Sequence, residues 1–381
     1  MRPSGRYEGS RWVNSIGKRI TVTADTEAKA RKALETKVSA ISNGETSGRR
    51  TKMTFGPYAE QVIAQREGIG DRTRDKYRTD LRLYLRPLHT VRIDQVTAPL
   101  LRITYAALRK AGLSDSVRGH AHTLARMVLE TAKNDGLIAV NSADVPNIRP
   151  KPERGAKGKP VQAYNKTQVT QILAAASQVV HGENIAFLIQ TGMRRGEMLG
   201  LRWNAVNLTH NTASIHTTRS ASGSRVYEGT PKTEQSRRDV PLSKSVLNLL
   251  CSLKALNAER HAALYPDQPE SLYVFPSMRG TAQRPDNVRR ILHQILDLAD
   301  RQTQEAENLR AAEQGTEPRQ VTALPRLPVH ALRHTFVSLM AEQGQRLEVI
   351  AGWIGDKPAT MLKIYLHVFK SSTSMPSLDL D

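Results

Sequence analysis

Apolar residues recur every three or four positions along most of the chain, and this spacing predicts a mainly helical protein. Gly112 and Gly136 follow two of the periodic stretches, at the positions where helices commonly end. The pattern between residues 55 and 148 predicts a compact bundle of four or five helices, built from YAEQVIAQRE, RTRDKYRTDLRLYLRPL, TAPLLRITYAALRKAG and SVRGHAHTLARMVLETAKNDG.

Residues 1–50 show a different pattern. The stretch SRWVNSIGKRITVTADT alternates apolar and polar side chains, as short strands do. Thr26 then precedes a run that begins with Glu27 and Ala28, which is a suitable helix start. The hydrophilic stretch SNGETSGRRTK that follows is typical of a linker. These features predict a small strand-plus-helix domain joined to the helical bundle.

Beyond Thr167 the pattern is mixed and predicts an α/β domain. The expected helices are QVTQILAAASQVV, NIAFLIQTG, SVLNLLCSLKALNAER, a long charged helix over 286–314 and two more before Lys370. The expected strands are TASIHTTR, RRDVPL and LYVFP. The polar tail after residue 370 is expected to be mobile. The predicted fold class is therefore multidomain, mainly α with small β.

Composition points to a partner with negative charge. The net charge is +20, of which residues 1–52 carry +7 and residues 149–166 carry +5. A surplus concentrated in two short segments indicates that these segments grip a polyanion such as DNA, although a solvated surface could also carry such charge. The second segment is rich in proline and glycine and predicts a basic connection whose candidate DNA contacts are Arg149, Lys151, Arg154, Lys157 and Lys159.

The remaining bulk features concern location. Cys251 is the single cysteine, which excludes an internal disulfide framework and a cysteine-based zinc site. No apolar run is long enough to span a bilayer, and the start of the chain lacks the apolar core of a secretory signal. We therefore expect an intracellular, cytoplasmic protein that is not associated with a membrane.

Four motifs carry candidate chemistry. In TGMRRGEMLGLRW, a glycine turn delivers Arg194 at a helix start, with Glu197 three residues on. In GTPKTEQSRRDVPL, Lys232 lies in an expected turn between two strands. Helical spacing places three side chains of HALRH on one face, and IAGWIGDKPATMLKIYLH presents a tyrosine on a short helix; these four residues are His330, Arg333, His334 and Tyr365.

Each motif also has a simpler interpretation. An arginine at a helix start or a lysine in a hairpin is usually solvated, and a tyrosine on an apolar helix usually packs. The pair His330 and His334 could chelate zinc, but the sequence offers no HExxH glutamate and no obvious third ligand. The motifs are therefore informative only as a set.

The order of the four motifs resembles the tyrosine recombinases, the phage-integrase family. The likeness extends to TFGPYAEQ, to AGLSDSVRGHAHTLARMVLETAKNDGLIAVNSA and to the order of elements after residue 167. The resemblance implies an arm-type DNA-binding domain over 1–50, a helical, SAM-like core-binding domain over 54–148, a basic inter-domain linker over 149–166, a catalytic domain over 167–370 and a flexible tail over 371–381.

The resemblance also implies a reaction, which is DNA cleavage through a 3′-phosphotyrosine without a metal or other cofactor. Tyr365 matches the nucleophile, and Arg194 and Arg333 match the pair that clamps the non-bridging oxygens. Lys232 matches the general acid, and His330 matches the residue that accepts or relays the tyrosine proton. Two further residues, Glu197 and His334, match supporting positions.

One position departs from the family pattern. The residue after the glycine, nine residues before the tyrosine, is usually histidine or tryptophan in the family, but here it is Asp356. An ionised carboxylate cannot donate a hydrogen bond to the scissile phosphate. Either Lys357 or Trp353 supplies the donor, or Asp356 points away, or activity is reduced.

The implied partners are double-stranded DNA attachment sites, a homotetramer on DNA, and an accessory DNA-bending or directionality factor. The basic front segment favours a phage or mobile-element integrase. A Xer-like resolvase, a transposon-borne recombinase and a relaxing topoisomerase share the same chemistry. A DNA-binding protein with a decayed recombinase site is the alternative from another class.

Overall fold

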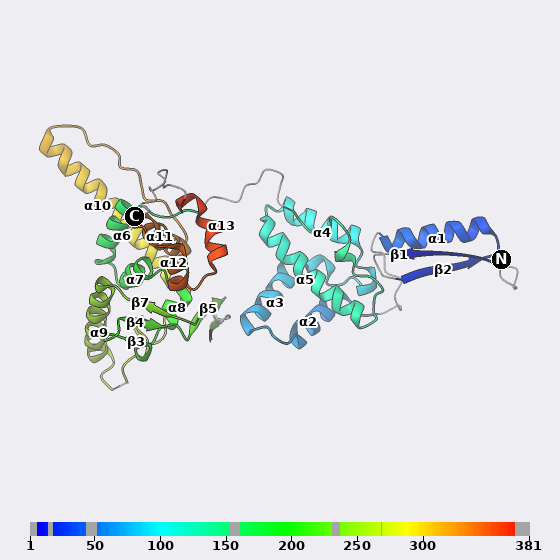
Figure 1. The fold of residues 1–381 in the computed structure, drawn as a ribbon, viewed down its shortest axis with the longest axis horizontal. Coiled ribbons are helices and arrows are strands. Elements are labelled where there is room, and N and C mark those ends of the chain that lie inside the picture. The colour runs from blue at the N-terminus through cyan, green and yellow to red at the C-terminus, as the bar shows by residue number, and fades with distance from the viewer. Residues whose placement is uncertain are drawn as a thin grey trace, which may run out of the picture. The chain divides into compact units, whose positions relative to one another are not determined.

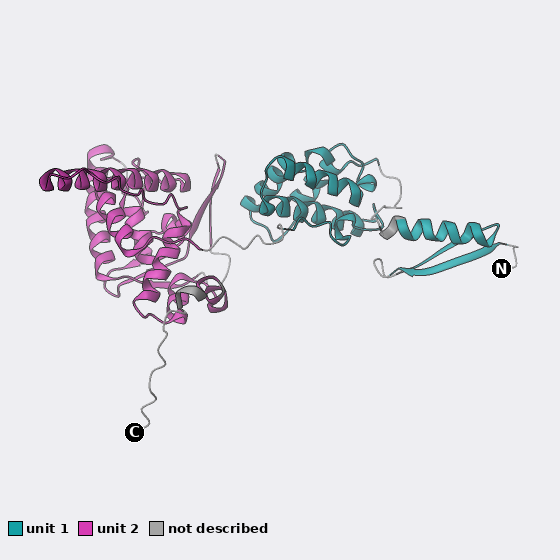
Figure 2. Cartoon of the chain, turned by 90° about the horizontal axis from the view of Figure 1, so that it is seen from above, with its two compact units in different colours: residues 1–157 teal, residues 158–381 magenta. Residues whose placement is uncertain are grey.

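The computed structural model describes residues 6–13, 18–42, 52–151, 161–223, 225–230, 237–267 and 269–369. The chain divides into two compact units, Met1–Lys157 and Gly158–Asp381 (Figures 1 and 2). Both consist mainly of helices with small antiparallel sheets, which confirms the predicted fold class. Within the described ranges, no helix is long and apolar enough to cross a membrane.

The first unit begins with a two-stranded antiparallel sheet, β1 (Tyr7–Val13) and β2 (Lys18–Ala24), against which helix α1 (Glu27–Ser42) packs. The hydroxyl of Thr26 accepts a hydrogen bond from the amide of Lys29 at 3.3 Å, which caps the first turn of α1. The predicted strand-plus-helix pattern is therefore confirmed.

Four helices form the rest of the first unit: α2 (Phe55–Gln65), α3 (Asp71–Tyr84), α4 (Ala98–Lys110) and α5 (Asp115–Asn134). Their apolar faces form one buried cluster around side chains such as Phe55, Leu81, Leu101 and Leu124. Gly112 and Gly136 have φ angles of 75° and 73° after α4 and α5, as the sequence predicts for helix stops.

The second unit contains eight described helices and two small sheets (Figure 1). The helices are α6 (Lys166–Ala176), α7 (Glu183–Thr191), α8 (Arg195–Gly200), α9 (Lys244–Leu264), α10 (Pro285–Gln314), α11 (His330–Glu342), α12 (Leu347–Ile354) and α13 (Pro358–Phe369). The strands are β3 (Val206–Asn207), β4 (Thr212–Ser214), β5 (Thr218–Ser222), β6 (Arg225–Gly229) and β7 (Asp239–Pro241), ordered β3-β4-β7 and β5-β6.

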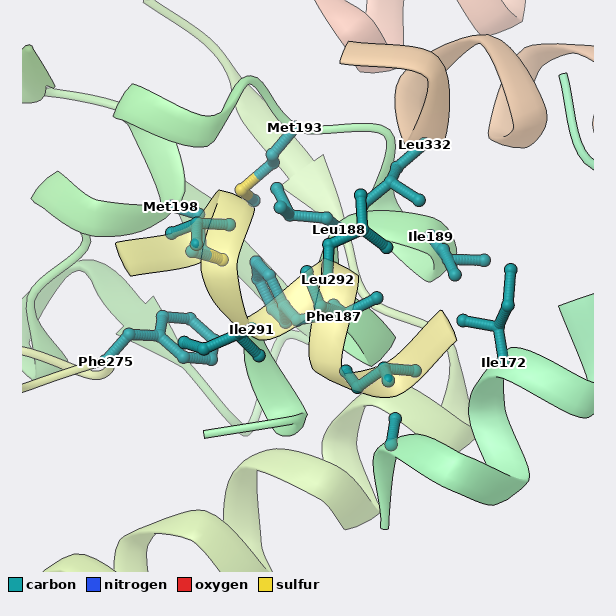
Figure 3. Close-up of a cluster of buried hydrophobic side chains, with 14 of the residues drawn as sticks. Ile172, Phe187, Leu188, Ile189, Met193, Met198, Phe275, Ile291, Leu292 and Leu332 are labelled. Carbon is teal, nitrogen blue, oxygen red and sulfur yellow. The ribbon is translucent and has the colours of Figure 1, made fainter. Parts of the chain in front are cut away.

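Two apolar clusters hold this unit together. The large one packs α7 against α10 and α11 and includes Phe187, Met198 and Leu292 (Figure 3). The smaller one joins α11, α12 and α13 through Phe336, Val337, Ile350, Ala351, Ile354, Met361 and Tyr365. The elements that carry the candidate site therefore pack on two distinct cores.

The structure corrects three expectations about the second unit. LYVFP is not a strand, because only Tyr273 pairs with a neighbouring segment, in an isolated bridge with Arg202 that no longer ladder extends. TASIHTTR divides between β4 and β5. Tyr164, expected at the end of a linker, is 1% exposed, and its hydroxyl donates to the carbonyl of Pro325.

Candidate active site

Arg194 is delivered to the site by a tight turn between α7 and α8. Gly192 ends α7 with a φ of 63°, and a Cβ at this position would lie 2.4 Å from Cδ1 of Phe336. Arg194 then caps α8, with its amide donating to Oε2 of Glu197 at 3.0 Å. As the sequence predicts, the arginine stands where a helix begins.

Gly192→Ala is expected to destabilise the second unit by about 3 kcal/mol, combining left-handed backbone strain of about 1 kcal/mol with overpacking of about 2 kcal/mol against Phe336. Urea unfolding of the wild type and of Gly192→Ala measures the difference in the free energy of unfolding. Gly344→Ala is the matched control, because Gly344 has a φ of 79° but open space around its Cβ position. Equal losses at the two positions would contradict the packing argument.

Arg333, on α11, lies beside Arg194. Its side chain is 3% exposed, and its Nη1 donates to the carbonyl of Gly192 at 3.0 Å. Burial lowers the pKa of Arg333, and the charge of Arg194 lowers it further. Arg194 is more open, at 36% side-chain exposure. The two guanidinium groups therefore form an anion-binding pair fixed from behind by backbone.

The structure places Asp356 between these two arginines. Oδ1 of Asp356 accepts a hydrogen bond from Nη2 of Arg194, and Oδ2 accepts one from Nη2 of Arg333 at 2.6 Å. Of the three alternatives for this position, the one in which Asp356 points away from the site is therefore wrong. Opposite charge explains the difference, since two adjacent guanidinium groups attract the nearest carboxylate.

A second carboxylate, Glu197, supports the arginine pair from the interior. Its side chain is 3% exposed; Oε1 accepts from Nη1 of Arg194 at 2.8 Å, and Oε2 accepts from Nη2 of Arg238 at 3.0 Å. Burial alone would raise the pKa of Glu197, but the hydrogen bond and charge of Arg238 lower it below its usual value. Glu197 is therefore ionised at neutral pH.

Sequence reasoning missed Arg238, which it placed only in an expected strand. The side chain is 7% exposed, and Nε donates to the carbonyl of Trp353 at 2.6 Å. Arg238 thus ties β7 to α8 and to the end of α12. The sequence carries no signal for Arg238, because the burial of Glu197, which makes a second cation necessary, is seen only in the structure.

Arg238→Ala is expected to slow the DNA cleavage that the resemblance implies by about 10- to 100-fold, the equivalent of one lost charged hydrogen bond. Without Arg238, burial raises the pKa of Glu197, so the rate falls off at a higher pH as the solution is acidified. Rate–pH profiles of adduct formation measure this shift. Arg238→Lys keeps the charge and is expected to restore part of the profile. If the rate–pH profiles of Arg238→Ala and the wild type differed only in the maximum rate, and not in their position on the pH axis, Arg238 would not act through the pKa of Glu197.

The nucleophile candidate Tyr365 lies on α13 and is 3% exposed. Its hydroxyl makes a hydrogen bond with Nδ1 of His334, and the rings of His334 and His330 meet edge to face with their centroids 4.7 Å apart. Burial raises the pKa of Tyr365 to about 12, partly opposed by the charge of Arg333. Tyr365 therefore keeps its proton at neutral pH and needs a base.

Both histidines are neutral at neutral pH. Burial and the neighbouring His330 lower the pKa of His334 to about 4. Loss of hydration and the charges of Arg333 and Arg194 lower the pKa of His330. A neutral imidazole has one bare nitrogen that accepts a proton. The structure places His334, rather than His330, directly on the Tyr365 hydroxyl.

The other candidates are only partly described. Lys232 lies outside the described residues, and so do Arg154, Lys157 and Lys159. The strands on either side of Lys232 are not partners as expected, because β6 pairs with β5 and β7 pairs with β4. The two described candidates for DNA contact, Arg149 and Lys151, are both exposed.

The candidate site thus contains Arg194 at the start of α8, Arg333 on α11, and Tyr365 on α13 bonded to His334. The chain belongs to the phage integrase family, whose model matches residues 163–372. The chain is 22% identical to a XerC-like tyrosine recombinase of Caldanaerobacter subterraneus, over 77% of this chain and 73% of that protein. It is 26% identical to the integrase of Mycobacterium phage L5, over 52% of each chain.

Solved structures share the fold. The Tn1549 transposon integrase in complex with transposon right end DNA matches with a TM-score of 0.62 and 18% identity, over 86% of this chain and 96% of that chain. A lambda integrase tetramer bound to a Holliday junction matches with a TM-score of 0.55 and 13% identity, over 95% and 93%. The chain is thus a tyrosine site-specific recombinase by family, and the solved structures show that it shares their fold.

Proposed function

We propose that this protein integrates and excises a phage or other mobile genome by cutting and rejoining DNA through Tyr365. The observation that carries the proposal is the convergence on one site of Arg194, Arg333 and the Tyr365–His334 pair, from α8, α11 and α13. This set supplies an anion clamp, a nucleophile and a proton acceptor, which are the parts that phosphoryl transfer requires.

In the proposed reaction, the Tyr365 oxygen attacks a backbone phosphorus and loses its proton to a histidine. His334 accepts it directly, and His330 relays it. The bond from phosphorus to the 5′-oxygen breaks, leaving a 3′-phosphotyrosine and a 5′-hydroxyl that takes its proton from Lys232. Arg194 and Arg333 hold the non-bridging oxygens as negative charge builds up. Rejoining reverses these steps, so the phosphodiester energy is conserved.

The assembly follows from what recombination needs. Two cuts on each of two duplexes require four protomers and a Holliday junction between the rounds of exchange. The lambda integrase tetramer bound to a Holliday junction supports this arrangement by its likeness of fold. The partners are double-stranded attachment sites, with Arg149, Lys151, Arg154, Lys157 and Lys159 on the backbone and residues 1–50 on arm sites. An accessory bending or directionality factor completes the complex on the host nucleoid, in the cytoplasm.

The proposal is tested without knowing the attachment site. The protein is incubated, with EDTA present, with a pool of random-sequence duplexes that carry a nick at a fixed place. Cleavage close to the nick releases a short strand, so rejoining fails and a detergent-resistant protein–DNA adduct accumulates. Sequencing the captured DNA identifies the site, and mass spectrometry is expected to find the nucleotide on Tyr365. Absence of an adduct, or cleavage that stops on chelation, would overturn the proposal.

A further inference from the structure

Asp356 presents its two oxygens to the arginine pair in the way a phosphodiester would. One oxygen accepts from Arg194 and the other accepts from Arg333, so each guanidinium has one carboxylate oxygen. Two non-bridging phosphate oxygens require the same arrangement of donors. The carboxylate therefore occupies the position on the arginine pair that the scissile phosphate needs.

The backbone around Asp356 is fixed, and its side chain can rotate. Gly355 ends α12 with a φ of 67°, and the amide of Asp356 donates to the carbonyl of Ala351 at 3.1 Å, which is a Schellman closure of the helix. The Asp356 side chain is 27% exposed, so one side of it meets solvent. Displacing the carboxylate consequently needs a change of side-chain rotamer and no unfolding of α12.

The Asp356 carboxylate and a DNA phosphate cannot both bind the arginine pair, because both are negatively charged. The described cluster joins the guanidinium groups of Arg194, Arg238 and Arg333 to the carboxylates of Glu197 and Asp356. Glu197 lies behind the arginines and stays when DNA binds. A phosphate that entered while Asp356 remained in place would put two anions on the same pair of donors.

We propose that Asp356 is an internal anion that holds the arginine pair until a phosphodiester displaces it, and that it thereby determines which DNA sites are cleaved. This inference rests on the proposed function for its DNA step. A site that binds the protein well supplies enough energy to expel the carboxylate, whereas a poorly matched site does not. Asp356 thus increases the difference in cleavage between well-matched and poorly matched DNA sites, and it lowers the affinity of the arginine pair for phosphate.

The first test measures anion binding to the free protein by calorimetry with sodium sulfate. Asp356→Asn is expected to bind sulfate about tenfold more tightly than the wild type, because the neutral amide competes less for the arginine donors. The factor is the equivalent of one charge-assisted hydrogen bond. Asp300→Asn is the matched control, since it changes the net charge equally at a distant ion pair with Arg326. Equal sulfate affinity in the wild type and Asp356→Asn overturns the inference.

The second test measures single-turnover cleavage of nicked duplexes that carry the captured site or a version with substituted base pairs. Asp356→Asn is expected to cleave the substituted site about tenfold faster than the wild type does, and to gain less than this on the captured site. Slower cleavage of both, with normal folding, would make Asp356 a positioning residue and overturn the inference. If neither protein forms an adduct, the proposed function fails, and the sulfate comparison still decides the role of Asp356.

Discussion

Tyr365→Phe is expected to abolish the covalent adduct completely while leaving DNA binding within about twofold of the wild type. Phenylalanine keeps the ring that packs against Phe336 and Met361 in the small cluster, but it removes the only atom that attacks phosphorus. A loss of this kind exceeds what any supporting residue produces, because no second nucleophile replaces the hydroxyl. Gel electrophoresis in detergent measures the adduct, and a mobility shift measures binding.

The control for this variant is a second tyrosine of the same unit. Tyr273 also has a partnered hydroxyl, which donates to Glu228 at 2.9 Å, but it lies between Arg202 and Arg219, away from the candidate site. Tyr273→Phe is expected to retain adduct formation. Residual adduct in Tyr365→Phe, or its loss in Tyr273→Phe alone, would show that the nucleophile has been misassigned.

Arg333→Lys is expected to reduce the rate of cleavage about 1,000-fold at saturating DNA. Lysine keeps the charge but has a single compact ammonium. Arg333 instead donates to the carbonyl of Gly192 and, through its other terminal nitrogen, to the carboxylate of Asp356, whose place the phosphate is proposed to take. Loss of one oriented donor to a developing phosphorane oxygen costs about 100- to 1,000-fold, and the buried position of Arg333 favours the upper end. Single-turnover kinetics on the captured site measure the rate.

The same substitution at an exposed ion pair provides the comparison. Arg326 bonds Asp297 and Asp300 on the surface of α10, at 41% side-chain exposure. Arg326→Lys is expected to leave the cleavage rate unchanged. It is expected to change the free energy of unfolding by no more than about 0.5 kcal/mol. A similar rate in Arg333→Lys and the wild type would mean that charge alone, and not the guanidinium fork, holds the phosphate.

Much of the fold was predictable because the signals are local. The helices of the first unit follow from apolar spacing, and their ends follow from Gly112 and Gly136, whose backbone angles need no information from distant residues. The strand-plus-helix start and the long helix α10 follow in the same way. The LYVFP prediction was wrong because a strand also needs a hydrogen-bonded ladder, and tertiary packing gives this stretch only one bridge, at Tyr273, which periodicity does not report.

Several members of the candidate site were predictable, but their contacts were not. The order of the motifs indicated Arg194, Arg333 and Tyr365, and the structure brings them together. Which histidine bonds the tyrosine, and where the Asp356 carboxylate points, depend on the packing of α12 and α13 against α11. Arg238 could not be found from spacing, because its partner Glu197 lies 41 positions away in the chain.

The division of the second unit into two apolar clusters has a mechanical consequence. Tyr365 is anchored in the small cluster of seven buried side chains, apart from the large one that holds α7 and α10. A shift of α13 toward a bound duplex would disturb the small cluster and not the large one, as far as the described side chains show. The free-energy cost of moving the nucleophile is therefore set by the packing of this small cluster, which includes Phe336, Ile350, Ile354 and Met361.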